Sequence, residues 1–588
     1  MKISTEQRRA GVLTPVFALR SRDDLGVGDT GALTAMIDWC AHTGFSVLQI
    51  LPVNETSDDN SPYNAISSAA LDITTLTVSP SAVPGLTQKI LDECCPLTMV
   101  EKLRSGPVQY RAVKQLKLEL CRRAFANFTK SRGRNADGQR AQFARFVADE
   151  RAWLADYCRF RALMELNGGA PMWERWRAEH RSPAAAGAWL ASRSAAAQKK
   201  FARAEKFFAF VQWLLFTQWD AASAHGQRRG VALMGDLPFG VSRHSADVWA
   251  ARENFDLRWS GGAPPEPCFQ PDEFTKQWGQ NWGLPLYDWE FMRRDGYAWW
   301  RRRVALTARL FKLFRVDHIL GFYRCYAFPW RPEENAAYAA LTAGAAQTRA
   351  GALPRFFPND DDTEASRTAN RAHGEELIKM LQAAAGDSVM VGEDLGVVPG
   401  YVRPSLAALN VSGFKIPLFE RDAASREYLP PEEYPPLTVA TLATHDHATM
   451  AGQWAAWWRE YRAARAAAGT PGADNELIQK GTYASWELYR TQRFCRLDDR
   501  TLLADFEPAV REGLCRRLLA ARSWLAVLMV TDLFGLDIRF NAPGPVADSN
   551  WSARLPFRVE EFADDERRRD LIGFITRLMR ETGRTVSA

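Results

Sequence analysis

The stretch Phe314–His318 (FRVDH) is a short apolar run that ends in a carboxylate, and runs of this kind recur along the chain. Near-continuous apolar runs are typical of strands that are covered on both faces, as in parallel sheets. Eight such runs occur: Gly11–Leu19, Ser46–Asn54, Val231–Phe239, Phe314–His318, Ser388–Asp394, Gly413–Phe419, Thr438–Asp446 and Leu525–Leu533.

Helical patterns lie between many of these runs. In Thr30–His42, for example, the apolar residues Leu33, Met36, Ile37 and Cys40 fall on one stripe of a helix. Alternating strands and helices predict a parallel α/β sheet, and eight strands predict a (β/α)₈ TIM barrel.

Some gaps between the predicted strands are too long for a simple crossover. The gap from Asn54 to Val231 is the longest, and its second half is helical in pattern and rich in Ala, Arg, Trp and Phe. We therefore expect one barrel domain over residues 1–588, with helical insertion subdomains on barrel loops at about 75–225, 255–290 and 325–385.

Composition excludes several classes of protein. The net charge of +6 is small beside 75 basic and 69 acidic residues, which argues against a nucleic-acid partner. The nine cysteines form no C-x-x-C pair, so we expect reduced thiols and no metal site. The N-terminus has no apolar signal region, and no run of about 18 apolar residues occurs. These features predict a cytoplasmic protein with no membrane contact.

A polar residue stands where several of the predicted strands end. In a parallel barrel these positions share the C-terminal mouth, where active sites lie. One acid alone is more often a helix N-cap, but several acids that converge indicate a site. The residues are Asn54, Asp236, Asp317, Glu393, Asp446 and Asp532.

Two carboxylates on either side of one glycosidic bond are what retaining glycosyl transfer requires. One attacks the anomeric carbon, and the other must be protonated so that it can give a proton to the leaving oxygen. Glu393 follows an apolar run, which favours a protonated carboxyl. Arg315 and Asp317 share one face of a strand, so the arginine could keep Asp317 ionised.

Other short motifs follow in a fixed order along nearly the whole chain. They are Arg9–Leu13, Asp24–Asp29, Ser61–Tyr63, Gly235–Pro238, Ser245–Trp249, Gly261–Pro265, Gly279–Pro285, Asn541–Gly544, Asn550–Trp551 and Arg554–Pro556. With the three acidic segments they resemble the 4-α-glucanotransferases of glycoside hydrolase family 77, relatives of the α-amylases. Val241 stands where α-amylases carry a histidine, which favours the glucanotransferases.

The resemblance implies a role for each matching residue. Asp317 would be the nucleophile, Glu393 the general acid/base, and Asp446 a third carboxylate that holds sugar hydroxyls. The implied sugar contacts are Arg315, His318 and His445, with Tyr63 stacked below the ring, Gln280 and Trp282 on a loop over the cleft, and Asp236 and Asn541 as sugar-binding or site-supporting positions. Maltooligosaccharides, amylose and glycogen-derived glucans would be substrates, with glucose as acceptor and no cofactor or metal.

Two alternatives stay open at this point, and a dinucleotide site is rejected. An α-1,4-glucan hydrolase could use the same barrel, and a non-catalytic glucan-binding protein could retain it. The Gly26–Gly31 segment matches G-x-G-x-x-G, but it begins seven residues after Leu19, whereas a dinucleotide fingerprint turns directly off its strand. The segment Gly261–Pro285 is also longer than in compact family members, with Glu266–Phe269 after its proline pair, and we expect it to shape the cleft.

Overall fold

Eight parallel strands form the centre of the protein, whose computed structural model describes residues 2–57, 59–266, 270–468, 474–544 and 549–585. Each strand lies in or at the edge of one of the eight predicted runs, so the predicted (β/α)₈ barrel is confirmed. The strands are β1 (Arg9–Leu13), β2 (Val47–Gln49), β3 (Ala232–Leu237), β6 (Leu313–Val316), β9 (Val389–Gly392), β10 (Gly413–Lys415), β11 (Thr438–Thr441) and β12 (Leu525–Met529).

The barrel closes on itself. The strand order is β10-β11-β12-β1-β2-β3-β6-β9, and every neighbouring pair is parallel. Val391 in β9 then forms a parallel bridge to Ser412, and the Gly392 N–H donates to the Ser412 carbonyl over 2.9 Å. Because β3, β6 and β9 are consecutive in this ring, the residues at their carboxyl ends become neighbours.

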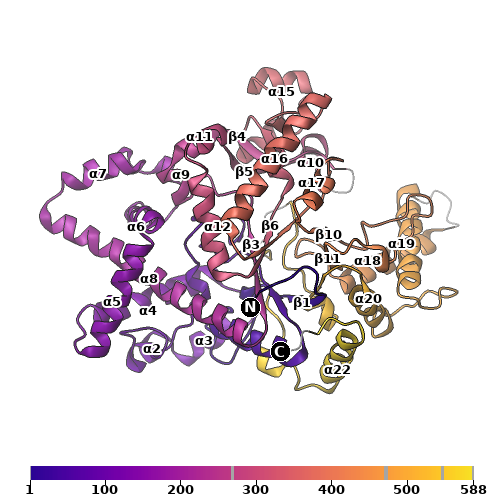
Figure 1. Ribbon diagram of the computed structural model, residues 1–588, viewed down its shortest axis with the longest axis horizontal. Coiled ribbons are helices and arrows are strands. Elements are labelled where there is room, and N and C mark those ends of the chain that lie inside the picture. The colour runs from indigo at the N-terminus through magenta and orange to yellow at the C-terminus, as the bar shows by residue number, and fades with distance from the viewer. Residues whose placement is uncertain (1, 58, 267–269, 469–473, 545–548, 586–588) are drawn as a thin grey trace.

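Helices surround the barrel in the order of the chain (Figure 1). The predicted helix over 30–42 is α1 (Thr30–Thr43), which begins at the N-cap Asp29. The other helices before β9 are α2 (Gln88–Cys94), α3 (Leu97–Arg104), α4 (Tyr110–Phe128), α5 (Arg134–Asp149), α6 (Arg151–Leu166), α7 (Pro183–Ala191), α8 (Ala195–Arg228), α9 (Ala246–Ala250), α10 (Glu273–Trp278), α11 (Trp289–Arg294), α12 (Ala298–Leu310), α13 (Leu320–Tyr323), α14 (Asn335–Tyr338), α15 (Ala343–Ala350) and α16 (Glu364–Ala385). After β9 follow α17 (Val402–Ala408), α18 (Met450–Ala467), α19 (Asn475–Phe494), α20 (Ala509–Ala520), α21 (Val530–Phe534) and α22 (Glu566–Glu581).

The long segment between β2 and β3 is helical, and helices α2 to α7 extend to one side of the barrel (Figure 1). Its core is aromatic: Phe128 on α4 and Phe143 on α5 both pack against Phe210 and Trp213 of α8. Large rings bury much apolar surface per residue, so a few of them suffice to attach these helices to α8. Many of the aromatic residues therefore serve as core.

The segments at 255–290 and 325–385 differ from the helical prediction. They contribute an antiparallel sheet with the order β5-β4-β7-β8, in addition to helices. Its strands are β4 (Phe255–Ala263), β5 (Gln280–Tyr287), β7 (Cys325–Phe328) and β8 (Arg355–Phe357). These strands are short or interrupted by glycine, and β4 and β5 expose part of their length, so no continuous apolar run marks them. A small separate core of Phe274, Trp278, Phe328, Trp330 and Tyr338 packs beside this sheet.

The glycines of Gly26–Gly31 serve packing. A Cβ on Gly28 would lie 1.9 Å from the Val16 carbonyl oxygen, so only glycine fits there. The Asp29 carboxylate is engaged as the N-cap of α1, accepting from the N–H groups of Gly31 and Ala32. This arrangement agrees with the rejection of a dinucleotide site.

Eight cysteines lie in the described part of the chain, and all are free thiols. Cys268 lies outside the described residues. Over the same described ranges, every helix is too short or too polar to cross a membrane.

A buried arginine joins the C-terminal segment to the end of the barrel at which the strands begin. The Arg584 side chain is fully buried and donates to the carbonyl oxygens of Leu519 (2.6 Å), Ala521 (2.6 Å), Ser523 (3.0 Å) and Arg9 (2.7 Å). These carbonyls lie where α20 ends and where β1 and β12 begin. One guanidinium therefore satisfies four acceptors that have little access to water.

We expect Arg584→Ala to lower the free energy of unfolding by about 2–4 kcal/mol, because it removes a donor from four buried carbonyls, of which only those of Leu519 and Ala521 also accept from Arg8. Urea unfolding measures the change. Arg580→Ala, an exposed arginine on α22, is the matched control and should be close to neutral. Equal stability of the two variants would show that the buried contacts contribute nothing.

Candidate active site

Three predicted acids lie at the C-terminal mouth, and two of them directly follow barrel strands. Asp317 follows β6, and its N–H donates to the Leu237 carbonyl at the end of β3 over 3.0 Å. Glu393 follows β9, and its N–H donates to the Val316 carbonyl over 3.0 Å. The barrel ladder thus continues up to the two carboxylates and fixes their backbones. Asp446 lies on the loop after β11.

Arg315 is the cation around which these acids gather. Its side chain is 5% exposed, and its Nη1 lies 2.8 Å from Asp236 Oδ2. Its Nη2 lies 2.8 Å from Asp317 Oδ1 and 3.7 Å from Glu393 Oε2. The contact with Asp317 is the one that the spacing of two residues along a strand predicts. One guanidinium thus faces three carboxylates.

The distances to Arg315 also limit the separation of the Asp317 and Glu393 carboxylates. Asp317 Oδ1 and Glu393 Oε2 lie 2.8 and 3.7 Å from the same nitrogen. These two oxygens are therefore at most about 6.5 Å apart, which is compatible with the roughly 5–5.5 Å separation of retaining enzymes.

Glu393 is held between backbone N–H groups in a poorly solvated position. Its Oε2 accepts from the His318 N–H over 2.9 Å, and its Oε1 accepts from the Leu395 N–H over 3.0 Å. His318 has a φ of 43°, a conformation uncommon outside glycine, and strain of this kind is frequent at functional sites. Burial, reinforced by the charge of Asp317, outweighs Arg315 and raises the pKa of Glu393 to about 7.

Asp236 lies below the mouth, and its side chain has no exposed surface. Tyr63 donates its hydroxyl to Asp236 Oδ2 over 2.7 Å, and Arg315 contacts both carboxylate oxygens. Burial raises the pKa of Asp236 to about 7, against the opposing effect of Arg315. Burial also raises the pKa of Tyr63 well above its ordinary value, so the phenol remains a donor. Asp236 therefore supports Tyr63 and Arg315 from below.

Asp446 and its neighbours form a more open part of the site. The Asp446 side chain is 36% exposed and accepts from Asn541 Nδ2 over 2.7 Å. Burial alone would raise its pKa, but His445, Asn541 and Arg315 together lower the pKa of this carboxyl, which keeps it ionised. Burial lowers the pKa of His445 to about 4, so its imidazole is neutral at pH 7. The His445 ring stacks on Tyr63 at 5.3 Å.

Gln280 and Trp282 lie on strand β5, not on the predicted loop, and they reach the same mouth. The Trp282 ring lies edge-to-face with the His318 ring at 4.9 Å and remains 37% exposed. Its Nε1 donates weakly to Gln280 Oε1 over 3.4 Å. Burial lowers the pKa of His318 to about 4, so this ring is also neutral. Part of the predicted loop, residues 267–269, lies outside the described residues.

The structure adds residues that sequence reasoning did not assign to the site. The Trp551 ring lies 5.7 Å from the rings of both Tyr63 and His445, and Phe239 packs edge-to-face on His318. Arg539 donates to the Asp446 carbonyl over 2.7 Å. Trp551 lies in the Asn550–Trp551 motif that supports the family resemblance, and this motif was the signal in the sequence that could have marked it as a site residue. Phe239 and Arg539 carry no such signal.

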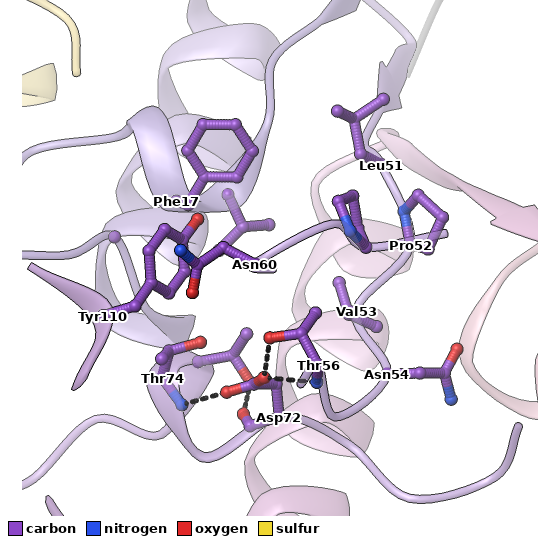
Figure 2. A pocket seen from close by; sticks show the side chains of 14 residues that line it. Phe17, Leu51, Pro52, Val53, Asn54, Thr56, Asn60, Asp72, Thr74 and Tyr110 are labelled. Carbon is purple, nitrogen blue, oxygen red and sulfur yellow. Dashed lines mark hydrogen bonds between the residues drawn. The ribbon is translucent and has the colours of Figure 1, made fainter. Parts of the chain in front are cut away.

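Two polar strand-end residues take part in other contacts. Asp532 accepts from the Met450 N–H over 2.7 Å at the start of α18. Asn54 donates to the Ala70 carbonyl and lines a cavity of about 40 Å³. Figure 2 shows this cavity, where Asp72 accepts hydrogen bonds from Thr56 and Thr74. It has room for a few water molecules but not for a sugar ring.

Comparison with known proteins gives the family. The family described as 4-alpha-glucanotransferase, glycoside hydrolase family 77, matches residues 14–559. The 4-alpha-glucanotransferase of Chlamydia pneumoniae is 28% identical, with 94% of this chain and 92% of that protein covered. The 4-alpha-glucanotransferase of Chlamydia caviae is 31% identical, with 94% and 91% covered.

Two solved structures share the fold. The amylomaltase of Streptococcus agalactiae, in complex with acarbose, has a TM-score of 0.72 at 22% identity, with 99% of this chain and 100% of that chain covered. The amylomaltase of Corynebacterium glutamicum has a TM-score of 0.74 at 22% identity, with 98% and 75% covered. The barrel fold, together with the family match and the curated relatives, defines a carbohydrate-active enzyme of the transglycosylase class. More specifically, the chain belongs to the 4-alpha-glucanotransferase family.

The raised pKa of Glu393 predicts how stability depends on pH. An acid whose pKa rises from 4.5 to about 7 on folding binds its proton more tightly in the folded state. The free energy of unfolding therefore falls as the pH rises from 4.5 to 7, by on the order of 1–3 kcal/mol from this group. We expect Glu393→Gln to remove that part of the fall.

Urea unfolding at pH 5 and pH 8 measures the difference. Glu273→Gln is the control, because its carboxylate is 83% exposed and should leave the pH dependence of the wild type unchanged. A Glu393→Gln variant with the pH dependence of the wild type would contradict the raised pKa.

Proposed function

We propose that this member of the family transfers a segment of an α-1,4-glucan to the 4-hydroxyl of glucose or of another α-1,4-glucan. The reaction is a double displacement with retention of configuration. The observation that carries the proposal is that Arg315 Nη2 contacts both Asp317 and Glu393, while burial raises the pKa of Glu393 to about 7. The proposed nucleophile, Asp317, and the proposed acid, Glu393, thus contact the same guanidinium.

In the first step, an Asp317 oxygen forms a bond to the anomeric carbon of the donor. The glycosidic C–O bond breaks, and its electron pair goes to the leaving oxygen, which takes the proton of Glu393. The shortened glucan leaves with a free 4-hydroxyl. Asp317 then holds the glycosyl segment as a β-linked ester, and Glu393 is ionised.

In the second step, the 4-hydroxyl of the acceptor gives its proton to Glu393. Its oxygen forms a bond to the anomeric carbon, and the ester bond to Asp317 breaks. The product has an α-1,4 bond, and both carboxyls return to their first state. The number of glycosidic bonds is unchanged, so reducing ends are conserved.

The other residues have supporting roles in this proposal. Asp446, held by Asn541, accepts hydrogen bonds from sugar hydroxyls. Its negative charge stabilises the positive charge of the transition state. The neutral imidazoles of His445 and His318 contact the sugar. Buried Asp236 orients Tyr63 and Arg315.

Trp282 and Gln280 are placed to cover the cleft and to exclude water. The edge-to-face contact of Trp282 with His318 supports this role. Exclusion of water separates transfer from hydrolysis. Family membership also favours transfer over the hydrolase alternative.

We infer that the substrates are maltooligosaccharides, amylose or glycogen-derived glucans, with glucose as an acceptor, and that the protein acts in the cytoplasm in glycogen and maltodextrin metabolism. The names of the curated relatives support a glucan substrate. We also propose that residues 1–588 form one catalytic domain, with insertions at about 75–225, 255–290 and 325–385. In support, α8 packs against α1, α12 and β3 of the barrel.

Incubation with maltotriose tests the reaction. We expect glucose and a ladder of longer maltodextrins at a constant number of reducing ends, because a sugar replaces each cleaved bond. Chromatography of the products and a reducing-end assay measure this. A rise in reducing ends with only glucose and maltose would assign the reaction to hydrolysis.

Variants of the two acids test the roles in the same assay. We expect Asp317→Asn and Glu393→Gln to lower kcat at least about 10³-fold with an intact fold. Far-UV circular dichroism checks the fold. Turnover close to that of the wild type in either variant would refute its assigned role.

The pH dependence of kcat should follow the ionisation of the Glu393 carboxyl. Because the acid form donates the proton and its pKa is raised to about 7, kcat should fall as the pH rises above 7. Steady-state rates on maltotriose from pH 5 to pH 9 measure this fall in kcat. A rate that stays constant up to pH 9 would assign proton donation to another group.

A further inference from the structure

Two large aromatic side chains are exposed on the surface of α19. Tyr483 is 51% exposed and Trp486 is 55% exposed. Residues three apart are neighbours on a helix, so the two rings share one face. Single exposed apolar residues are ordinary, but two exposed aromatic residues on one helix face form a patch. We call Tyr483 and Trp486 the α19 platform.

The α19 platform rests on a rigid charged base. Glu487, which follows Trp486, is fully buried and forms a bidentate pair with Arg421 at 2.8 and 2.9 Å. Arg490 contacts the same carboxylate at 2.6 Å, and Tyr428 donates to it over 2.6 Å. Burial would raise the pKa of Glu487, but these donors outweigh burial and lower it. The helix face below the rings is therefore fixed before any ligand binds.

The charges of this base also indicate which ligand fits. Arg421 and Arg490 share the Glu487 carboxylate, and Arg490 also lies 3.8 Å from Glu427, so both cations of the base have acidic partners. Arg490 lies 5.7 Å from the centroid of the Trp486 ring. The surface thus combines flat apolar rings with nearby N–H donors and little net charge. A neutral ligand with apolar faces and hydroxyl edges matches it, and a glucose unit has both.

The α19 platform lies on the mouth side of the barrel and is linked to the candidate active site. Arg421 is on the segment after β10, and its Nε donates to the Leu418 carbonyl over 2.9 Å. Between them lies Phe419, whose ring is 53% exposed and 5.3 Å from the ring of His447. His447 follows Asp446 directly. A line of contacts thus runs from the third carboxylate to the base of the platform.

We propose that the α19 platform is a second binding site for α-1,4-glucan chains, at which Tyr483 and Trp486 stack on glucose units of a polymer whose other units reach the cleft. The proposal rests on the function proposed above, because it takes the glucan to be the substrate. A long chain can occupy both sites, which makes its second contact intramolecular and raises its affinity. Maltotriose is too short to do so.

The test is native electrophoresis in gels that contain soluble amylose, with all variants built on Glu393→Gln to suppress turnover. We expect Tyr483→Ala/Trp486→Ala to raise the apparent dissociation constant for amylose at least about tenfold. Leu97→Ala is the control, because Leu97 is 80% exposed on α3 and should not alter retardation. Trp486→Phe alone keeps a ring and should retain most of the affinity.

In the active background, the double variant should disproportionate maltotriose at the wild-type rate and unfold at the wild-type temperature. Retardation by amylose equal to that of the parent would overturn the proposal. A parallel loss of maltotriose activity would also overturn it, because the rings would then serve the cleft itself. If the wild type fails to transfer maltotriose but the double variant still loses retardation, the platform stands and the proposed function fails.

Discussion

The site depends on the placement of a single buried cation among three carboxylates. Arg315 carries one positive charge, while Asp236, Asp317 and Glu393 could together carry three negative charges. In a poorly solvated pocket it is costly to ionise all three carboxylates beside one cation. Some of these carboxylates therefore bind a proton. Burial is the main cause of the raised pKa values of Asp236 and Glu393, and the charge of Asp317 adds to it against the opposing effect of Arg315. The acid that the proposed reaction requires is thus a consequence of the burial and the charges of the site.

Barrel closure places these groups. Asp236, Arg315 and Glu393 come from β3, β6 and the end of β9, which are adjacent in the ring although more than 150 residues separate the first from the last. The pairing of Asp236 with Arg315 in the β3–β6 register fixes their relative height. Asp446 comes from the other side of the mouth and stays more exposed, which suits contact with sugar hydroxyls in the proposed reaction.

The surroundings of the barrel complete the site from outside. The antiparallel sheet carries Trp282 to His318, and the C-terminal segment brings Trp551 to Tyr63 and Asn541 to Asp446. These elements determine how far the mouth is closed to water. Farther out, the loops after β10 and β11 carry exposed rings that extend from Asp446 toward α19. Under the proposed function such a surface would favour polymeric substrates, because each extra contact with the same chain is intramolecular.

The sequence by itself determined the eight barrel strands, because strands buried on both faces must be apolar along their length, and it placed Asp317, Glu393 and Asp446 at strand ends. The family motifs also indicated Tyr63, Asn541 and Trp282. Only the tertiary structure decided the rest. The strands β4, β5, β7 and β8 lack a continuous apolar run, so their pairing is set by partners far away in the chain. Likewise, burial of Asp236, the neutral state of His445 and the shared contact with Arg315 depend on groups that folding brings together, and no local pattern records which charges will be neighbours.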